Sequence, residues 1–199
     1  MSIGGMELNL KQLREFVTFI PGINPTRAQY QIENQEIQFY DQSSFTEDYK
    51  HEGISIEDQH VALKNNHALM AGDVVISNSL QCATLVSTKN AGKVLSLNFT
   101  KLELDEQQLD KGYFLFLFNV YKSVKYQKEK KLQGSGPILR IPLQSLGEIM
   151  IPIVPIEEQR KIGAIYIKTL KLQSELSEYS KLMELFTNEI LEESVKGCS

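Results

Sequence analysis

The segment that decides the fold is IPIVPIEEQRKIGAIYIKTLKLQSELSEYSKLMELFTNEILEESVK, residues 151–196. Pro152 and Pro155 lie at its beginning, and from residue 157 onward the segment contains no proline and only one glycine, Gly163. Proline and glycine are the residues that most often end a helix, so this stretch predicts one continuous helix. A helix of 40 residues is about 60 Å long at about 1.5 Å per residue.

Apolar residues follow this predicted helix at alternating spacings of three and four, the heptad pattern of a helix that packs against another long helix. The expected partner-helix residues are Ile162, Ile165, Leu172, Leu176, Tyr179, Met183, Phe186 and Ile190, with Thr169 as the polar member of the series. No second helix of this length is expected elsewhere in the chain, so the pattern predicts a partner chain. Folding back onto the preceding domain is the alternative. Leucines off this line, such as Leu170 and Leu182, favour more than one partner helix.

The preceding residues, 1–153, show shorter and mixed patterns. Runs rich in β-branched residues and bounded by turn residues predict a small, mostly antiparallel sheet or a partly open barrel. These runs cover residues 72–77, 83–87 and 94–99. Helical spacing predicts a short helix over residues 8–19 and another from Leu109 to Val124, the second ending at residues 134–137. Residues 32–40 are expected to be extended, and residues 41–60 to form an irregular surface segment.

The predicted fold class is therefore α+β. We expect a globular domain, residues 1–153, with a small mostly antiparallel β-sheet and short helices. A long C-terminal coiled-coil α-helix follows in residues 154–199.

Composition excludes several classes of protein. The chain has 199 residues, of which 42% are hydrophobic and 23% are charged, so it can form a core and is not a disordered polymer. Its longest apolar run, residues 113–121, is about half of the roughly 20 residues that a membrane helix needs, and the N-terminus lacks a charged and then apolar leader. Cys82 and Cys198 are far apart in the sequence, so we expect no disulfide framework. We therefore expect a cytoplasmic location.

Charge is distributed unevenly along the chain. The net charge is −4, but residues 1–120 carry a net −6 and residues 121–140 a net +5. A local basic strip can neutralise nucleic-acid phosphates even on an acidic protein, because screening makes nearby charges dominate. The strip consists of Lys122, Lys125, Lys128, Lys130, Lys131 and Arg140. A solvated helix face is the alternative interpretation.

Catalytic motifs are absent from the sequence. It contains no glycine-rich nucleotide loop, no Gly-x-Ser-x-Gly and no His-Glu-x-x-His. A metal site from His51, His60 and His67 is an unfavoured alternative. A metal-dependent nuclease that uses Asp41, Asp48 or Glu52 is the least favoured one.

Residues 151–162, Ile-Pro-Ile-Val-Pro-Ile-Glu-Glu-Gln-Arg-Lys-Ile, resemble the Ile-Pro-x-Pro-(x)-x-Glu-Gln-x-x-Ile signature of the specificity (S) subunits of type I restriction-modification enzymes. Residues 13–22 are similar to the opening motif of that family, residues 69–77 to its Gly-Asp strand, and residues 112–136 to its Tyr-Leu helix and glycine-rich turn. S subunits are typically about twice as long, with two recognition domains and two conserved helices, so this chain resembles a half subunit. Its Pro-Ile-Val-Pro junction also differs from the usual Pro-Leu-Pro-Pro.

The resemblance implies a subunit without catalytic activity. Its domain would read one half of a bipartite double-stranded DNA site, and its long helix would dock methyltransferase (M) subunits. No cofactor is expected on this chain, whereas S-adenosylmethionine is expected on the methyltransferase. A restriction (R) subunit is an optional further partner. A half subunit can supply its missing half by forming a two-fold homodimer with antiparallel helices, which predicts an interrupted palindromic target.

The resemblance also implies that loops of the domain enter the major groove. Bases are read by polar or bidentate side chains, and the candidates are Gln133, Ser135, Arg27, Gln42, Ser43 and Asn78. The basic strip would contact phosphates and set the register on the duplex. The alternative function is an orphan interaction protein that binds methyltransferase or S subunits through its helix without reading DNA.

Overall fold

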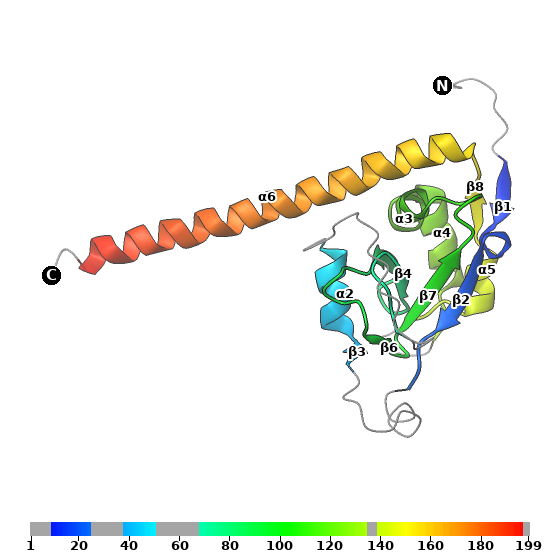
Figure 1. Ribbon diagram of the computed structural model, residues 1–199, viewed down its shortest axis with the longest axis horizontal. Helices are drawn as coiled ribbons and strands as arrows, with labels where there is room; N and C mark the ends of the chain where they lie inside the picture. The colour runs from blue at the N-terminus through cyan, green and yellow to red at the C-terminus, as the bar shows by residue number, and fades with distance from the viewer. Residues whose placement is uncertain (1–8, 25–37, 51–67, 135–138, 197–199) are drawn as a thin grey trace.

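A computed structural model describes residues 9–24, 38–50, 68–134 and 139–196. It has a mixed α+β domain from which one long helix extends (Figure 1), as the sequence predicts. The strands are β1 (Leu10–Gln12), β2 (Val17–Pro21), β3 (Phe39–Tyr40), β4 (Val74–Ser77), β5 (Cys82–Leu85), β6 (Val94–Leu95), β7 (Phe99–Leu104) and β8 (Met150–Pro152). The helices are the 3-10 turn η1 (Leu13–Glu15), α2 (Gln42–Tyr49), α3 (Lys111–Asn119), α4 (Lys122–Lys131), α5 (Leu143–Gly147) and α6 (Ile156–Lys196).

The main sheet has the order β2-β7-β4-β5, and all of its neighbours are antiparallel. Every residue of β4 is buried, because the sheet separates two hydrophobic clusters. Val74 and Ile76 belong to the larger cluster, which includes residues of α3, whereas Val75 belongs to a smaller cluster with Tyr40 and Phe45 beside α2. The alternation of side chains along a strand accounts for this division. The prediction of a small antiparallel sheet is confirmed.

The predicted helix over residues 8–19 is wrong. Residues 10–12 pair with β8 and residues 17–21 pair with β7, with a single 3-10 turn between them. Leu13 and Phe16 are buried as a helical pattern would require, but they are buried by the bend between the two strands. Pairing with residues far along the chain overrides the local helical spacing here.

The prediction of an irregular segment over residues 41–60 is wrong for its described part, which forms α2. Asp41 caps this helix by accepting a hydrogen bond from the Ser44 amide at 2.9 Å, and Phe45 anchors it in the smaller cluster. The predicted helix from Leu109 to Val124 is instead two helices, α3 and α4, which separate at residues 120–121. Of the extended segment over residues 32–40, the described end forms β3, which pairs in parallel with β6.

Helix α6 begins directly after Pro155 and leaves the domain beside α3 (Figure 1). Its first turns pack on the larger cluster through Ile162, Tyr166 and Ile167. Gly163 lies against Gly112 of α3 so closely that a side chain on either residue would meet the other backbone within 3.0 Å. Within the described residues, no helix is both long and apolar enough to cross a membrane.

Gln159 completes the joint between the helix and the domain. Its side chain is 1% exposed, accepts a hydrogen bond from the Asp110 amide at 3.1 Å, and donates to the carbonyls of Gln108 and Val154 at 3.0 and 2.9 Å. Both of its N–H donors and its carbonyl oxygen have partners within the chain, so buried contacts set the direction of α6 relative to the domain.

Candidate nucleic-acid interface and partner helix

The basic strip lies on α4 and on the segment that follows it. Lys122, Lys125 and Lys130 are exposed on α4, and Arg140 is exposed beyond it. The Lys130 ammonium lies 4.2 Å from the centre of the Tyr126 ring, which is also exposed. All four of these side chains are exposed to solvent. Phosphate contact by them stays a prediction.

Lys128 is different, because its side chain points into the domain. It is 6% exposed, donates hydrogen bonds to the carbonyls of Gln81 and Phe118 at 2.6 Å each, and lies 4.0 Å from the centre of the Phe118 ring. Burial lowers the pKa of Lys128 to about 8. The expectation that Lys128 contacts phosphate does not fit this geometry, since its donors are used in holding α4 on the sheet.

Lys131 is partly occupied as well. Its ammonium lies 2.9 Å from a carboxylate oxygen of Glu148, and the pair is half-buried. The hydrogen bond from Lys131 lowers the pKa of Glu148. A phosphate contact by Lys131 would have to compete with this ion pair.

Three of the predicted base-reading and phosphate-binding residues are brought together. Gln133 and Arg140 exchange backbone hydrogen bonds at 2.8 and 2.9 Å, and the Arg140 guanidinium donates to the Asn98 side chain at 2.9 Å. The Asn98 carbonyl accepts from the Asn78 amide at 2.9 Å, so Asn78 joins the same cluster. We call Asn78, Asn98, Gln133 and Arg140 the polar cluster. It combines amide and guanidinium groups, which are the groups that read base edges.

Asn98 was missed by sequence reasoning, although the turn Ser96-Leu97-Asn98 between two strands is a signal that could have found it. The turn at residues 78–81 is held firmly beside it. Thr100 donates to the Asn78 side chain at 2.9 Å, that side chain donates to the Leu97 carbonyl at 3.3 Å, and Gln81 adopts a left-handed conformation with φ 54°. The exposed Leu80 and Leu97 flank this turn.

Gln42 and Ser43 lie apart from these contacts, in the first turn of α2. Both are exposed, and the Gln42 amide donates to Thr46 at 3.4 Å within the helix. Arg27 and Ser135 lie outside the described residues, as do Glu52, His51, His60 and His67.

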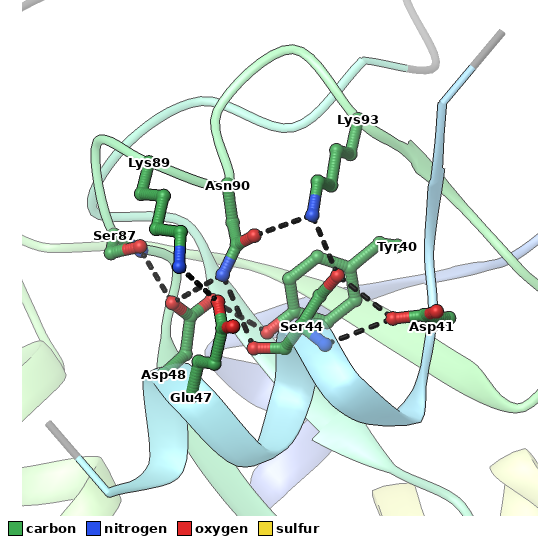
Figure 2. Close-up of polar contacts among 9 residues, drawn as sticks. All are labelled: Tyr40, Asp41, Ser44, Glu47, Asp48, Ser87, Lys89, Asn90 and Lys93. Carbon is green, nitrogen blue, oxygen red and sulfur yellow. Dashed lines mark hydrogen bonds and ion pairs between the residues drawn. The ribbon is translucent and has the colours of Figure 1, made fainter. Parts of the chain in front are cut away.

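A buried polar network fixes α2 on the domain (Figure 2). Asp48 is 1% exposed and accepts hydrogen bonds from the Tyr40 hydroxyl at 2.7 Å, the Asn90 side chain at 2.8 Å and the Ser87 amide at 3.2 Å. Lys93 donates to Asn90 and to Ser44 at 2.7 and 2.8 Å. Burial raises the pKa of Tyr40, so its phenol stays protonated and donating.

Two of the carboxylates considered for a metal-dependent nuclease, Asp41 and Asp48, have structural roles in this network. Asp48 is satisfied by three donors, and Asp41 caps α2, where the Ser44 amide lowers its pKa. In the part of the chain that the structure describes, no three His, Cys, Asp or Glu side chains gather as they would around a metal ion.

The heptad residues of α6 divide into two groups. Ile162 is half-buried against the domain, whereas Ile165, Leu172, Leu176, Tyr179, Met183, Phe186 and Ile190 are 45–71% exposed. The structure therefore does not fold this face back onto the described part of its own domain. We call the exposed heptad residues, with Thr169 among them, the free seam.

The described residues thus form an α+β domain followed by a long helix with an exposed apolar face. The chain belongs to the type I restriction modification DNA specificity domain family, whose model matches residues 7–185. No curated protein matches the chain in sequence.

Solved structures share the fold. A chain from a structure on complex assembly and conformational transition of the type I R-M system matches with a TM-score of 0.61 and 18% identity, over 95% of this chain and 45% of that one. The HsdS subunit of Thermoanaerobacter tengcongensis matches with a TM-score of 0.52 and 18% identity, over 88% and 41%. The S subunit of M. genitalium matches with a TM-score of 0.53 and 17% identity, over 90% and 42%. The chain spans less than half the length of these three chains.

Proposed function

We propose that this chain is a half-length specificity subunit that reads one half of a bipartite DNA site. Its domain, residues 1–153, contacts the DNA, and its helix region, residues 154–199, forms a homodimer and docks methyltransferase subunits that carry S-adenosylmethionine. A restriction subunit joins where the system has one, and the complex works in the cytoplasm. The observation that carries the proposal is the free seam on α6, in a family member that spans less than half of the solved S subunits. A second copy of the chain covers the free seam of the first.

The DNA-contacting surface of the proposed complex combines charge with hydrogen-bonding groups. The exposed cations Lys122, Lys125, Lys130 and Arg140 contact phosphates. The amide side chains of the polar cluster, together with Gln42 and Ser43, read bases. Arg27 and Ser135 remain base-reading candidates. Each phosphate contact releases counterions, so log Kd rises with log salt by about 0.9 per contact, or about 3.6 for the four exposed cations of a protomer.

A salt titration tests the phosphate contacts. The chain is purified with its methyltransferase subunit, and Kd for a duplex that contains the target is measured by fluorescence anisotropy at increasing salt. We expect K125A to reduce the slope by about 0.9 per protomer. The control is K161A, because Lys161 is an exposed lysine on α6 that pairs with Glu158 at 2.7 Å. A slope near zero for the wild-type complex refutes DNA contact by this strip.

Selection of bound duplexes from a randomised DNA pool tests the polar cluster. The wild-type complex should select an interrupted palindrome, and Q133A should lose or change bases at symmetric positions of both half-sites. Equal base preferences in Q133A and the wild type would remove Gln133 from the base-reading set.

The acidic character of residues 1–120 supports a second candidate, an interaction protein that binds methyltransferase or S subunits but does not read DNA. The same selection separates the two functions. Binding to the methyltransferase without enrichment of any DNA sequence favours the interaction protein.

A further inference from the structure

We propose that α6 pairs with α6 of a second copy in one antiparallel register, centred between Leu176 and Tyr179. In this register Lys168 of each copy forms an ion pair with the partner's Glu189. The inference rests on the homodimer of the proposed function, and it adds the contacts that hold the dimer and select its alignment.

The first reason for this register is the position of the two ends of the free seam. Ile162 is covered by its own domain, so the seam is available from Ile165 to Ile190. An antiparallel pair buries all of the seam only if the first residue of one helix opposes the last residue of the other. The resulting layers are Ile165 with Ile190, Thr169 with Phe186, Leu172 with Met183, and Leu176 with Tyr179, each occurring twice by symmetry.

Thr169 is the polar residue of the seam, and its geometry is compatible with burial. Its hydroxyl donates to the Ile165 carbonyl at 2.9 Å within α6. The hydroxyl is therefore satisfied inside its own helix, and the side-chain methyl is free to contact the partner's Phe186.

The charges that flank the seam give an independent reason. The residues on one flank, next to the heptad core, are Lys168, Glu175, Leu182 and Glu189. In an antiparallel pair this flank faces the same flank of the partner, and the proposed register places Lys168 against the partner's Glu189 and Glu175 against the partner's Leu182. Among the residues that the structure describes, neither Lys168 nor Glu189 has an ion-pair partner within the chain.

The neighbouring alignments bring like charges together. A shift of one heptad in one direction places Glu175 against the partner's Glu175. A shift in the other direction places Glu175 against the partner's Glu189, and Lys168 against the partner's Lys196. A parallel pair has no opposite charges in contact, since Lys168 would face the partner's Gln173. Like charges at such positions are destabilising, so charge and overlap select the same register.

Disulfide trapping measures the register directly in the full-length chain with Cys82 and Cys198 replaced by serine. The variant L172C/M183C places cysteines in opposite positions of the proposed register, whereas L172C/L176C does so only after a shift of one heptad. We expect the first pair to form covalent dimers under mild oxidation and the second to form several-fold fewer. All three positions are more than half exposed in the single chain, so these substitutions leave the domain intact.

Charge reversal tests the ion pair. We expect K168E and E189K each to raise the dimer Kd about 10-fold, because two attractive contacts become repulsive, and the double variant to restore it. A wild-type chain that stays monomeric by light scattering at high concentration refutes the homodimer itself. A stable wild-type dimer that crosslinks better through L172C/L176C, or that crosslinks through neither pair, refutes the register while the homodimer stands. Charge reversals without effect on a stable dimer refute the ion pair.

Discussion

Replacement of Gly163 by alanine should weaken the joint between α6 and the domain. A methyl group at this position would lie 2.6 Å from the Tyr113 amide nitrogen and 2.9 Å from the Gly112 carbonyl carbon, and closer still to the Asp110 carboxylate. It would therefore displace the Asp110 side chain, which caps α3 by accepting a hydrogen bond from the Tyr113 amide at 2.9 Å.

The size of the effect follows from three contributions. Loss of the cap costs about 1 kcal/mol. Separation of two helices that are packed backbone to backbone costs about 1–3 kcal/mol. Alanine favours the helix over glycine by about 1 kcal/mol, which offsets part of this loss. We therefore expect G163A to lower the free energy of unfolding by about 2 kcal/mol and the Tm by roughly 4–8 °C.

Urea denaturation followed by circular dichroism measures this change. The matched control is S177A, an exposed position of the same helix where alanine should raise stability by a few tenths of a kcal/mol. If G163A is as stable as the wild type or more stable, the close contact of the two glycines does not hold the joint.

Three further substitutions test buried polar groups. D48N should lower the free energy of unfolding by about 2–4 kcal/mol, since an amide cannot accept from all three donors around Asp48. E47Q, at the partly exposed Glu47–Lys89 ion pair, should change it by less than about 1 kcal/mol, and similar losses in the two variants would contradict the network. Burial lowers the pKa of Lys128 in the folded chain to about 8, below the ordinary value of 10.5, so between these pH values the unfolded chain binds more protons. The free energy of unfolding of the wild type, relative to that of K128M, should therefore rise as the pH increases from about 8 to 10.5. If urea titrations give the same difference between the two proteins throughout this range, Lys128 is not buried as a charge. Q159A leaves the Asp110 amide unpaired and should lower the Tm by several degrees, and an unchanged Tm would mean that water replaces the side chain without loss.

The long helix and the main strands are predictable because their signals are local. Absence of proline and a heptad repeat describe α6 without reference to any other part of the chain, and the apolar run at residues 74–77 describes a buried strand in the same way. The polar cluster is only partly predictable. Asn78, Gln133 and Arg140 have suitable side chains, but their proximity depends on the pairing of residues 133 and 140 around the turn at residues 96–98.

The structure of residues 10–21 and the burial of Lys128 could not be predicted from local sequence signals, because distant parts of the chain form their surroundings. Strands β1 and β2 exist because β8 and β7 pair with them, and their own spacing is helical. In the sequence alone Lys128 resembles the other surface lysines, and only the folded structure brings the carbonyls of Phe118 and Gln81 next to it. Its spacing of four from the buried Val124 was the available signal, because both residues then share one face of α4.

The joint at Gln159 and Gly163 sets the angle between α6 and the domain, and this angle determines how far apart the two domains of the proposed dimer lie. From Gln159 to the centre of the proposed register is about 18 residues, or about 28 Å of helix. With the domain held on its half-site, a change of about 10° in the angle at the joint would move the centre of the helix pair by about 5 Å, which is more than the roughly 3.4 Å rise of one base pair. An interrupted palindrome read by two domains at opposite ends of a helix pair therefore requires a joint that bends by less than this. A buried glutamine that makes three hydrogen bonds within the chain, beside two helices in backbone contact, provides that rigidity. G163A in the DNA-bound complex should therefore accept spacers one base pair longer or shorter than the wild type accepts.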